Sequence, residues 1–288
     1  MDNEEVKWPD QARCAVMLTF DLDAEITWLN ECRSHPHGER FIKTPSLGQY
    51  GPLRALPRLL EILNRYELPA TFFVPGWVAE NYPQEFVSIA EKGHEIGHHG
   101  YTHERFVEKS TQEQRDIIDK SQRIFEKLIG KKAVGYRTPS GDWSHETPKI
   151  LNELGFSFSS SMRGDDRPYR TIIEGKETDL IEIPAHWELD DYVQFAYSYF
   201  PAEPVGQGRI SSHEHVYDNY RREFDGYHRF GLCYVLMMHP QVIGKPGRAV
   251  MLEHLIQYMK SRQDVWFATG SEIADWWRSR YEGGKAGK

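Results

Sequence analysis

The chain alternates short apolar runs with longer amphipathic ones, and this alternation constrains its fold more than any other feature. The short runs are rich in β-branched and aromatic residues, which is typical of strands. They cover residues 15–20, 70–74, 95–98, 133–136, 156–160, 180–183, 234–238 and 265–268. Helical patterns cover residues 53–65, 112–128, 252–260 and 272–281. Because strands joined by helical crossovers run parallel, we predict an α/β fold, either an open doubly wound sheet or a barrel.

Local signals predict how three of these helices begin and pack. The helix at 53–65 has leucines on one stripe, starting from Leu53, which should face the core. Thr111 and Gln114 predict a capping box at the start of the second helix. Ser271 is the expected N-cap of the last helix.

Two segments, 25–51 and 161–178, interrupt the alternation after strand ends and are rich in Gly, Pro, Arg or His. We expect them to be long loops that shape a substrate site. No linker or low-complexity stretch divides the sequence, which predicts one catalytic domain over residues 1–288 with a frayed tail at 283–288.

Charge and hydropathy exclude several classes of protein. The 35 basic and 43 acidic residues leave a net charge of −8, which disfavours a nonspecific nucleic-acid binder. No run reaches the roughly 18 apolar residues that a membrane span needs. The acidic N-terminus and the short apolar run after it do not resemble a signal peptide. We therefore expect a cytoplasmic protein that binds neither nucleic acid nor a membrane.

Carboxylates and histidines follow the first and third predicted strands. Asp21 and Asp23 are two residues apart, so in a strand both face the same side, where they repel unless a cation lies beside them. An ordinary turn or helix N-cap is the alternative. His99 and His103 are four apart, which suits a helical turn or a tight loop converging on one ion. A solvated histidine-rich turn is the alternative there.

Other strand ends carry further candidates. Arg137 is a permanent cation whose fork suits a carboxylate, although the Pro and Gly that follow it indicate only a turn. His239 follows an apolar strand and is either a general acid or a satisfied core histidine. Substrate-lining roles are expected for Thr138, Pro139, Trp187 and Glu188, and a purely structural role for the tryptophan is nearly as well supported.

In this order, the motifs resemble those of the polysaccharide deacetylase superfamily, also called the NodB-homology or carbohydrate esterase 4 group. The usual TFDDG corresponds to TFDLDAE at 19–25, H(S/T)xxH to HGYTH at 99–103, RxPxG to RTPSG at 137–141, and Leu-x-x-His to Leu236 and His239. The spaced first motif, HGYTHE and IPAHWELDD are similar to one branch of the family. That branch contains allantoinase-like proteins, cyclic imide hydrolases and peptidoglycan deacetylases.

The resemblance implies a distorted (β/α) barrel with about seven parallel strands that hydrolyses a C–N bond of the amide type. Asp23, His99 and His103 would bind a divalent metal ion. Zn²⁺ is the first expectation, and Co²⁺, Ni²⁺, Mn²⁺ or Fe²⁺ also fit the ligand set. Asp21 would be the general base, although the two aspartates can exchange roles. The other expected roles are orientation of the base by Arg137, proton donation to the leaving nitrogen by His239, and oxyanion stabilisation by a backbone amide near Thr138.

The motifs are compatible with more than one class of substrate. The expected cytoplasmic location favours a small cyclic imide or ureide over a cell-wall polymer, which would require export. The alternative is an N-acetyl-sugar, peptidoglycan or polysaccharide deacetylase, and a further alternative is a catalytically silent metal-containing binding module. The resemblance also suggests a homo-oligomer.

Overall fold

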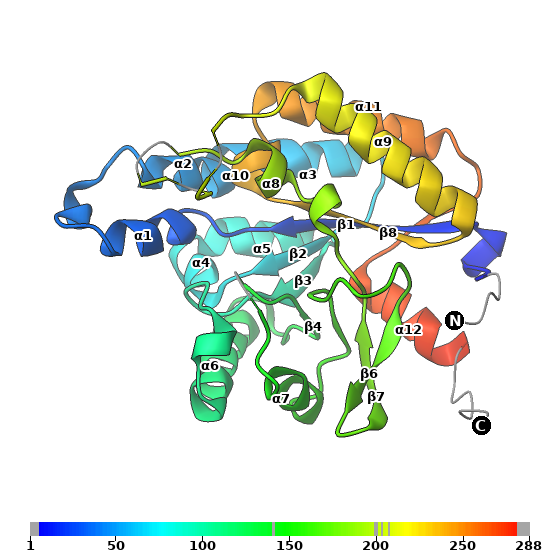
Figure 1. Ribbon diagram of the computed structural model, residues 1–288, viewed down its shortest axis with the longest axis horizontal. Helices are drawn as coiled ribbons and strands as arrows, with labels where there is room; N and C mark the ends of the chain where they lie inside the picture. The colour runs from blue at the N-terminus through cyan, green and yellow to red at the C-terminus, as the bar shows by residue number, and fades with distance from the viewer. Residues whose placement is uncertain (1–5, 140–141, 199–200, 203, 207, 281–288) are drawn as a thin grey trace.

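The computed structural model describes residues 6–139, 142–198, 201–202, 204–206 and 208–280. It has the predicted α/β fold with a largely parallel sheet (Figure 1). The strands of the described residues are β1 (Cys14–Asp21), β2 (Thr71–Val74), β3 (Glu95–His98), β4 (Gly135–Tyr136), β5 (Phe158–Ser159), β6 (Tyr169–Ile173), β7 (Lys176–Glu182), β8 (Cys233–Met238) and β9 (Val265–Phe267). The predicted tail at 283–288 and the last two residues of the RTPSG motif lie outside the described residues.

The sheet follows the order β6-β7-β5-β4-β3-β2-β1-β8, with β9 also paired to β1. From β7 to β8 this path contains seven strands, all parallel to their neighbours. Beyond β7, Asp190 forms a parallel bridge with Met237 of β8, so the two ends of the path meet. The prediction of a distorted barrel with about seven parallel strands is confirmed.

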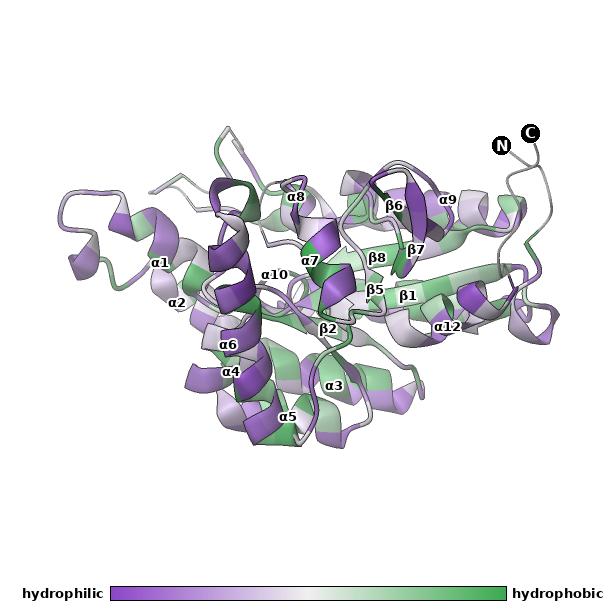
Figure 2. Cartoon of the chain, turned by 90° about the horizontal axis from the view of Figure 1, so that it is seen from below, coloured by the Kyte–Doolittle hydropathy of each residue, from purple (hydrophilic) through white to green (hydrophobic). Residues whose placement is uncertain are grey.

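The helices surround the strands. They are α1 (Ile26–Arg33), α2 (Pro45–Tyr50), α3 (Leu56–Arg65), α4 (Gly76–Asn81), α5 (Pro83–Glu91), α6 (Thr111–Ile129), α7 (Thr147–Glu153), α8 (Asp191–Phe195), α9 (His213–Phe230), α10 (Pro240–Ile243), α11 (Pro246–Lys260) and α12 (Gly270–Arg280). Helices α3, α11 and α9 pack side by side, and α4, α5, α6 and α7 form a second group (Figure 1). Figure 2 shows hydrophobic colouring along central strands such as β1 and β8, and hydrophilic colouring on the β6–β7 hairpin and on much of α6. No helix in the described part of the chain is long and apolar enough to cross a bilayer.

Both faces of the strands are buried because helices cover the outside of the barrel and side chains fill its inside. Phe72 of β2 belongs to the cluster under the helices, and Phe73 belongs to the inner cluster, as alternate residues of a strand must. Trp8 and Trp277 also belong to the inner cluster. The N-terminal segment and α12 therefore close the end of the barrel where the strands begin, and polar groups gather at the other end.

The two predicted loops contain regular structure. The 25–51 segment includes α1 and α2, and the 161–178 segment includes β6 and the start of β7. Strands β6 and β7 form an antiparallel hairpin across Glu174 and Gly175, both with positive φ (50° and 77°). Two consecutive residues of this kind match the twist of a two-residue hairpin. The loop prediction was wrong there because the half-exposed β6 has no apolar run.

The predicted start of the helix at 112–128 was displaced by one residue. Ser110 is the N-cap of α6 and forms a capping box with Glu113, whereas Thr111 is the first helical residue. Gln114 is buried, and its side-chain amide donates to Ser144 Oγ at 2.8 Å. Both pairings have the same spacing in the sequence, so the pattern alone did not distinguish them.

Two other local predictions were wrong. Thr269, not Ser271, caps α12, since its hydroxyl and backbone amide both bond to Glu272. Ser271 donates instead to the half-buried carboxylate of Glu95. Leu53 is 49% exposed because residues Gly51–Ala55 form a π-helical turn, which moves it off the leucine stripe of α3.

The capping box of α6 predicts unequal effects of neighbouring substitutions. Ser110→Ala should lower the free energy of unfolding by about 1 kcal/mol, because a backbone amide of the first turn loses its acceptor. Thr111→Ala is the matched control and should change it by less than about 0.5 kcal/mol. Urea unfolding followed by circular dichroism measures both. An equal or larger loss in the control would contradict the assignment of Ser110 as the cap.

Candidate metal centre and active site

The predicted catalytic and metal-binding residues meet at the carboxyl ends of the parallel strands. Asp21 ends β1 and Asp23 follows it, while His99, Arg137 and His239 come directly after β3, β4 and β8. All of them, together with His103, line one cavity of about 550 Å³. The carboxyl ends of parallel strands share one rim of a barrel, so residues far apart in the sequence converge there.

Asp23, His99 and His103 form a cluster whose ligand atoms face one another. Asp23 Oδ1 lies 3.5 Å from His99 Nε2 and 3.7 Å from His103 Nε2. Nitrogen and oxygen ligands about 2.0–2.1 Å from a tetrahedral ion would be roughly 3.3 Å apart. All three ligand atoms lie within 4.8 Å of one another, so the cluster is of the right size for one divalent ion.

The chemistry of the cluster also fits a cation. Asp23 Oδ1 is buried and has no hydrogen-bond partner among the described residues. Burial, together with nearby Asp21 and other carboxylates, raises the pKa of Asp23 to about 8. His99 Nδ1 lies 2.8 Å from the carbonyl oxygen of Arg137, which orients the ring and leaves Nε2 towards Asp23. Burial lowers the pKa of both histidines, which favours the neutral imidazole that a metal ion requires.

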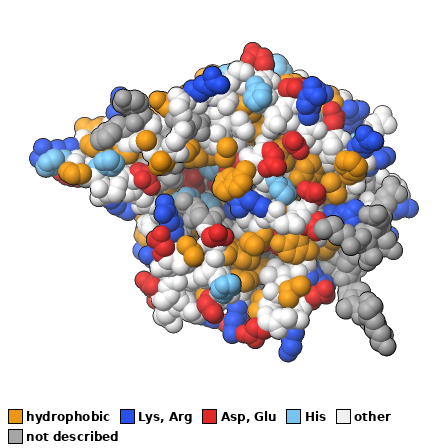
Figure 3. Space-filling model, viewed as in Figure 1, with side chains coloured by type: hydrophobic (Ala, Val, Ile, Leu, Met, Phe, Trp, Pro, Cys, Tyr) orange, Lys and Arg blue, Asp and Glu red, His pale blue; other side chains and the backbone are white. Residues whose placement is uncertain are grey.

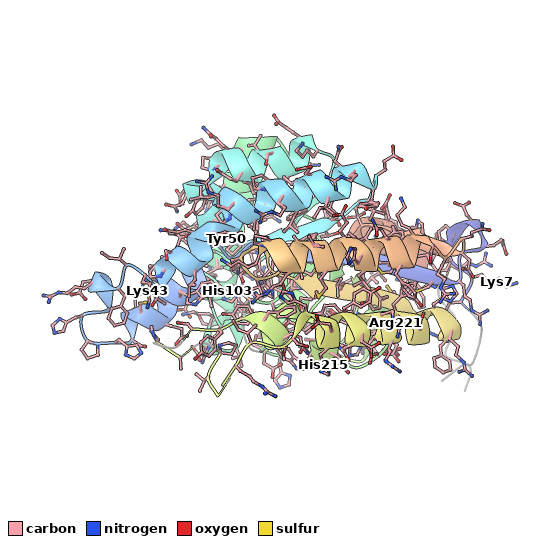
Figure 4. The ribbon with its side chains drawn as sticks, turned by 90° about the horizontal axis from the view of Figure 1, so that it is seen from above. Lys7, Lys43, Tyr50, His103, His215 and Arg221 are labelled. Atoms are coloured by element: carbon pink, nitrogen blue, oxygen red, sulfur yellow. The ribbon has the colours of Figure 1, made fainter. Side chains whose placement is uncertain are left out.

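A tight loop, not a helical turn, brings the two histidines together. Gly100 and His103 both have positive φ, 71° and 58°, and the second value is strained for a residue with a side chain. The carboxylate of Glu104 accepts hydrogen bonds from the amides of Tyr101 and Thr102 and so holds the loop closed. In Figure 4, the segment that carries Lys43 extends away from the body of the molecule, and His103 lies near the place where this segment begins.

Arg137 forms a buried network with Asp21. Its Nη1 donates to Asp21 Oδ1 at 2.7 Å and to Thr19 Oγ1 at 2.8 Å, while Nε and Nη2 donate to Ser160. Burial is the largest single influence on Asp21 and would raise its pKa, but Arg137, His99 and His239 together hold this pKa below its usual value. Asp21 is therefore ionised and has its second oxygen, Oδ2, 3.8 Å from His99 Nε2.

His239 is held by Asp191, a residue that the sequence did not single out. His239 Nδ1 lies 2.7 Å from Asp191 Oδ1, and the same carboxylate accepts the backbone amide of His239. Burial alone would lower the pKa of His239, but Asp191 and neighbouring Asp190 raise it to about 10. The only sequence signal for this pair was the run of acids after Trp187, and no spacing rule linked it to a histidine 48 residues away.

The four predicted substrate residues divide into two pairs. Thr138 and Trp187 line the cavity, whereas Pro139 and Glu188 do not. Pro139 packs against the loop at Gly100, and Glu188 is exposed in a 3-10 turn whose carbonyl accepts from Asn219 of α9. Successive residues of such a turn point in different directions, which separates Glu188 from Trp187.

The expected oxyanion donor near Thr138 is already used within the protein. The backbone amide of Thr138 donates to Ser161 Oγ at 3.0 Å, and the next residue, Pro139, has no N–H. That part of the predicted mechanism is not supported by the geometry.

The surface beneath α8 is mixed in character. Figure 3 shows acidic, basic and histidine side chains there, grouped around hydrophobic ones.

Fold and site together define an α/β barrel hydrolase that acts on C–N bonds other than peptide bonds. Residues 49–159 match the sequence profile described as polysaccharide deacetylase. The chain is 30% identical to the peptidoglycan deacetylase of Helicobacter pylori over 90% of its own length and 94% of that protein. It belongs to the polysaccharide deacetylase family.

Other relatives agree with this membership. The peptidoglycan deacetylase-like protein FGM2 of Gibberella zeae is 26% identical over 91% of this chain and 86% of its own. A Mycobacterium smegmatis structure that carries the name polysaccharide deacetylase superposes with a TM-score of 0.89 at 37% identity, covering 96% of this chain and 94% of that one. The structure of Puue allantoinase, at 22% identity and a TM-score of 0.82 over 96% and 94% of the two chains, shares the fold.

The geometry of the cluster predicts that His103→Ala loses bound metal. Removal of one of three protein ligands should weaken Zn²⁺ binding by more than about 100-fold, since even outer residues of metal sites contribute 10- to 100-fold. Elemental analysis and competition with a chelator measure this effect. His145→Ala, at an exposed position outside the cavity, is the control and should bind metal normally. Unchanged metal content in His103→Ala would exclude this residue as a ligand.

Proposed function

We propose that this protein is a metal-dependent deacetylase that hydrolyses the N-acetyl group of amino sugars in a glycan or oligosaccharide. One observation carries the proposal: an ionised carboxylate, Asp21, and a protonated imidazole, His239, face the same cavity beside the Asp–His–His cluster. Amide hydrolysis needs a base for the attacking water and an acid for the leaving nitrogen. The names of the relatives favour acetylated sugars as the substrate.

Asp21 is the proposed general base. Arg137 keeps its carboxylate ionised and holds one oxygen, so the other oxygen, Oδ2, is free to accept the proton of the attacking water. Asp23, with its unpartnered buried oxygen, is the proposed metal ligand. The arrangement thus supports different roles for two carboxylates that the spacing in the sequence leaves interchangeable.

His239 is the proposed general acid. Its Nδ1 is engaged by Asp191, so Nε2 is the atom that donates a proton to the leaving amine. Nε2 lies 3.9 Å from Asp21 Oδ2, close enough for base and acid to act on one amide group.

Asp23, His99 and His103 would hold the metal ion. When bound, a divalent ion polarises the acyl oxygen and makes a water molecule more acidic. Zn²⁺ suits a site of one carboxylate and two imidazoles, and Co²⁺, Ni²⁺, Mn²⁺ or Fe²⁺ are the alternatives.

The shape of the surface supports a substrate larger than one small ring. A second cavity of about 620 Å³ shares Thr138, Ser161, Arg163 and Trp187 with the first. An oligosaccharide can occupy both, whereas a cyclic imide or ureide needs only one. The likeness to the allantoinase is one of fold, so the small cyclic amide expected from the sequence has less support. The complete set of base, acid and orienting arginine argues against a silent binding module. Self-association and a cytoplasmic location stay predictions.

A panel of substrates tests the proposal. The zinc-loaded protein should release acetate from N-acetylglucosamine oligomers or peptidoglycan and should not open hydantoin, succinimide or allantoin. Asp21→Asn should lower the rate by about 10³-fold, in the range that general bases contribute, while metal content stays unchanged. Turnover of a cyclic imide without acetate release from any glycan would refute the proposal.

The raised pKa of His239 predicts the pH dependence of turnover. His239 must be protonated to act, so wild-type activity should persist into alkaline solution until the pH approaches about 10. Asp191→Asn removes a charged hydrogen-bond partner and should move the alkaline limit down by about one to two pH units. Asp190→Asn is the control and should move it less, because Asp190 Oδ1 lies 3.7 Å from the imidazole and forms no hydrogen bond with it. Identical profiles of kcat against pH in all three proteins would contradict the role of Asp191.

A further inference from the structure

Arg163 lies on the wall of the active-site cavity with most of its hydrogen-bonding capacity unused. Its guanidinium stacks 3.8 Å above the ring of Trp187, and Nη1 donates to the carbonyl oxygen of Ser161 at 3.0 Å. Within the residues that the structure describes, no carboxylate lies at ion-pair distance from it. The other arginine among the described residues of this cavity, Arg137, is buried and commits four of its five N–H groups to Asp21, Thr19 and Ser160. Arg163 is therefore the arginine that can offer N–H donors to a substrate.

The backbone that carries Arg163 is held from beneath by a buried carboxylate. Glu182, at the end of β7, accepts hydrogen bonds from the amides of Ser161 and Met162 at 2.6 and 2.7 Å. The carbonyl of Met162 also accepts the amide of Ala185 at 3.0 Å. A side chain on this anchored segment and stacked on an indole loses little conformational freedom when it binds a ligand.

Arg163 and Trp187 stand at the boundary between two cavities. Both residues line the active-site cavity, and both line the neighbouring cavity of about 620 Å³ that also contains Trp143 and Arg105. Trp187 is 53% exposed, so the stacked pair forms part of the open rim. A ligand with its amide at Asp21 and its remainder in the neighbouring cavity would contact the residues that the two cavities share, Arg163 among them.

We propose that Arg163, stacked on Trp187, is a specificity-determining residue that binds an anionic group, a carboxylate, carried by the substrate beside its scissile amide. A guanidinium fork matches a carboxylate with two parallel hydrogen bonds, and stacking on an aromatic ring sets its plane. A carboxylate beside an amide occurs in acidic N-acetylated sugars and in small N-acylated amino acids. The inference rests on the proposed function for the reaction, but binding alone tests it.

Binding to the zinc-loaded protein is measured by isothermal titration calorimetry with three probes: N-acetylmuramate, N-acetylglucosamine and N-acetylglycine. The wild type should bind an acidic probe more tightly than the neutral sugar, and Arg163→Gln should weaken acidic binding by about 10- to 100-fold, the usual contribution of a charged hydrogen bond. Binding of N-acetylglucosamine should change by less than about threefold. Whether N-acetylmuramate or N-acetylglycine depends on Arg163 distinguishes the two sources of the carboxylate.

Arg222→Gln is the matched control. Arg222 is exposed on α9, lines neither cavity, and its Nε lies 2.6 Å from Asp218. Its removal also lowers the positive charge by one but should leave the preference for acidic probes unchanged. Arg163→Lys should restore only part of the affinity, because an ammonium group cannot form the two parallel bonds.

The outcomes separate this inference from the proposed function. Equal loss of acidic and neutral binding in Arg163→Gln, no loss, or no detectable wild-type binding at millimolar concentration would overturn the role of Arg163. If Arg163→Gln releases acetate from neutral oligomers with an unchanged KM and binds acidic probes as the wild type does, the deacetylase function is supported and the role of Arg163 is rejected. Arg163-dependent binding of N-acetylglycine without turnover of any glycan would instead support the inference and reject the deacetylase function.

Discussion

The buried ion pair between Arg137 and Asp21 is the interaction on which the rest of the active site depends. One guanidinium joins the ends of three strands, since it bonds to Thr19 and Asp21 of β1 and to Ser160 beyond β5 while following β4 itself. A charge buried without partners costs several kcal/mol, so this network is strongly specified. Arg137 is bound to Asp21, and Oδ1 of the next carboxylate, Asp23, has no hydrogen-bond partner among the described residues, which leaves this atom available to a metal ion.

The same constraint separates the acid and base properties of the site. Asp21 has a lowered pKa beside a guanidinium, whereas burial and neighbouring carboxylates raise the pKa of Asp23 to about 8. Its partner Asp191 raises the pKa of His239 to about 10, whereas burial lowers the pKa of His103. Titratable groups of one kind thus acquire opposite roles from their surroundings, which is how enzymes operate acids and bases at one pH.

Much of the fold was predictable because a buried parallel strand must be apolar on both faces. Each of the eight apolar runs contains or overlaps a strand, and their alternation with helices predicted parallel pairing. The errors have different causes. Strand β6 is half-exposed and pairs only through a hairpin, so it has no continuous apolar run. Helix α1 is apolar at four of its positions but has only eight residues, which is too short for a repeating helical stripe. The displaced caps of α6 and α12 reflect hydroxyl residues at adjacent positions, between which only the backbone geometry chooses.

By itself, the sequence determined the residue types of the site, their places at strand ends and the family that they resemble. Spacing also grouped His99 with His103, since four residues fit one loop. Only the tertiary structure decided that Arg137 holds Asp21, that Asp191 holds His239 and that Arg163 stacks on Trp187. It also moved Pro139 and Glu188 out of the cavity. The physical reason is that hydrogen bonds and ion pairs act over a few ångströms, and the distances between side chains of different strands exist only after the barrel has closed.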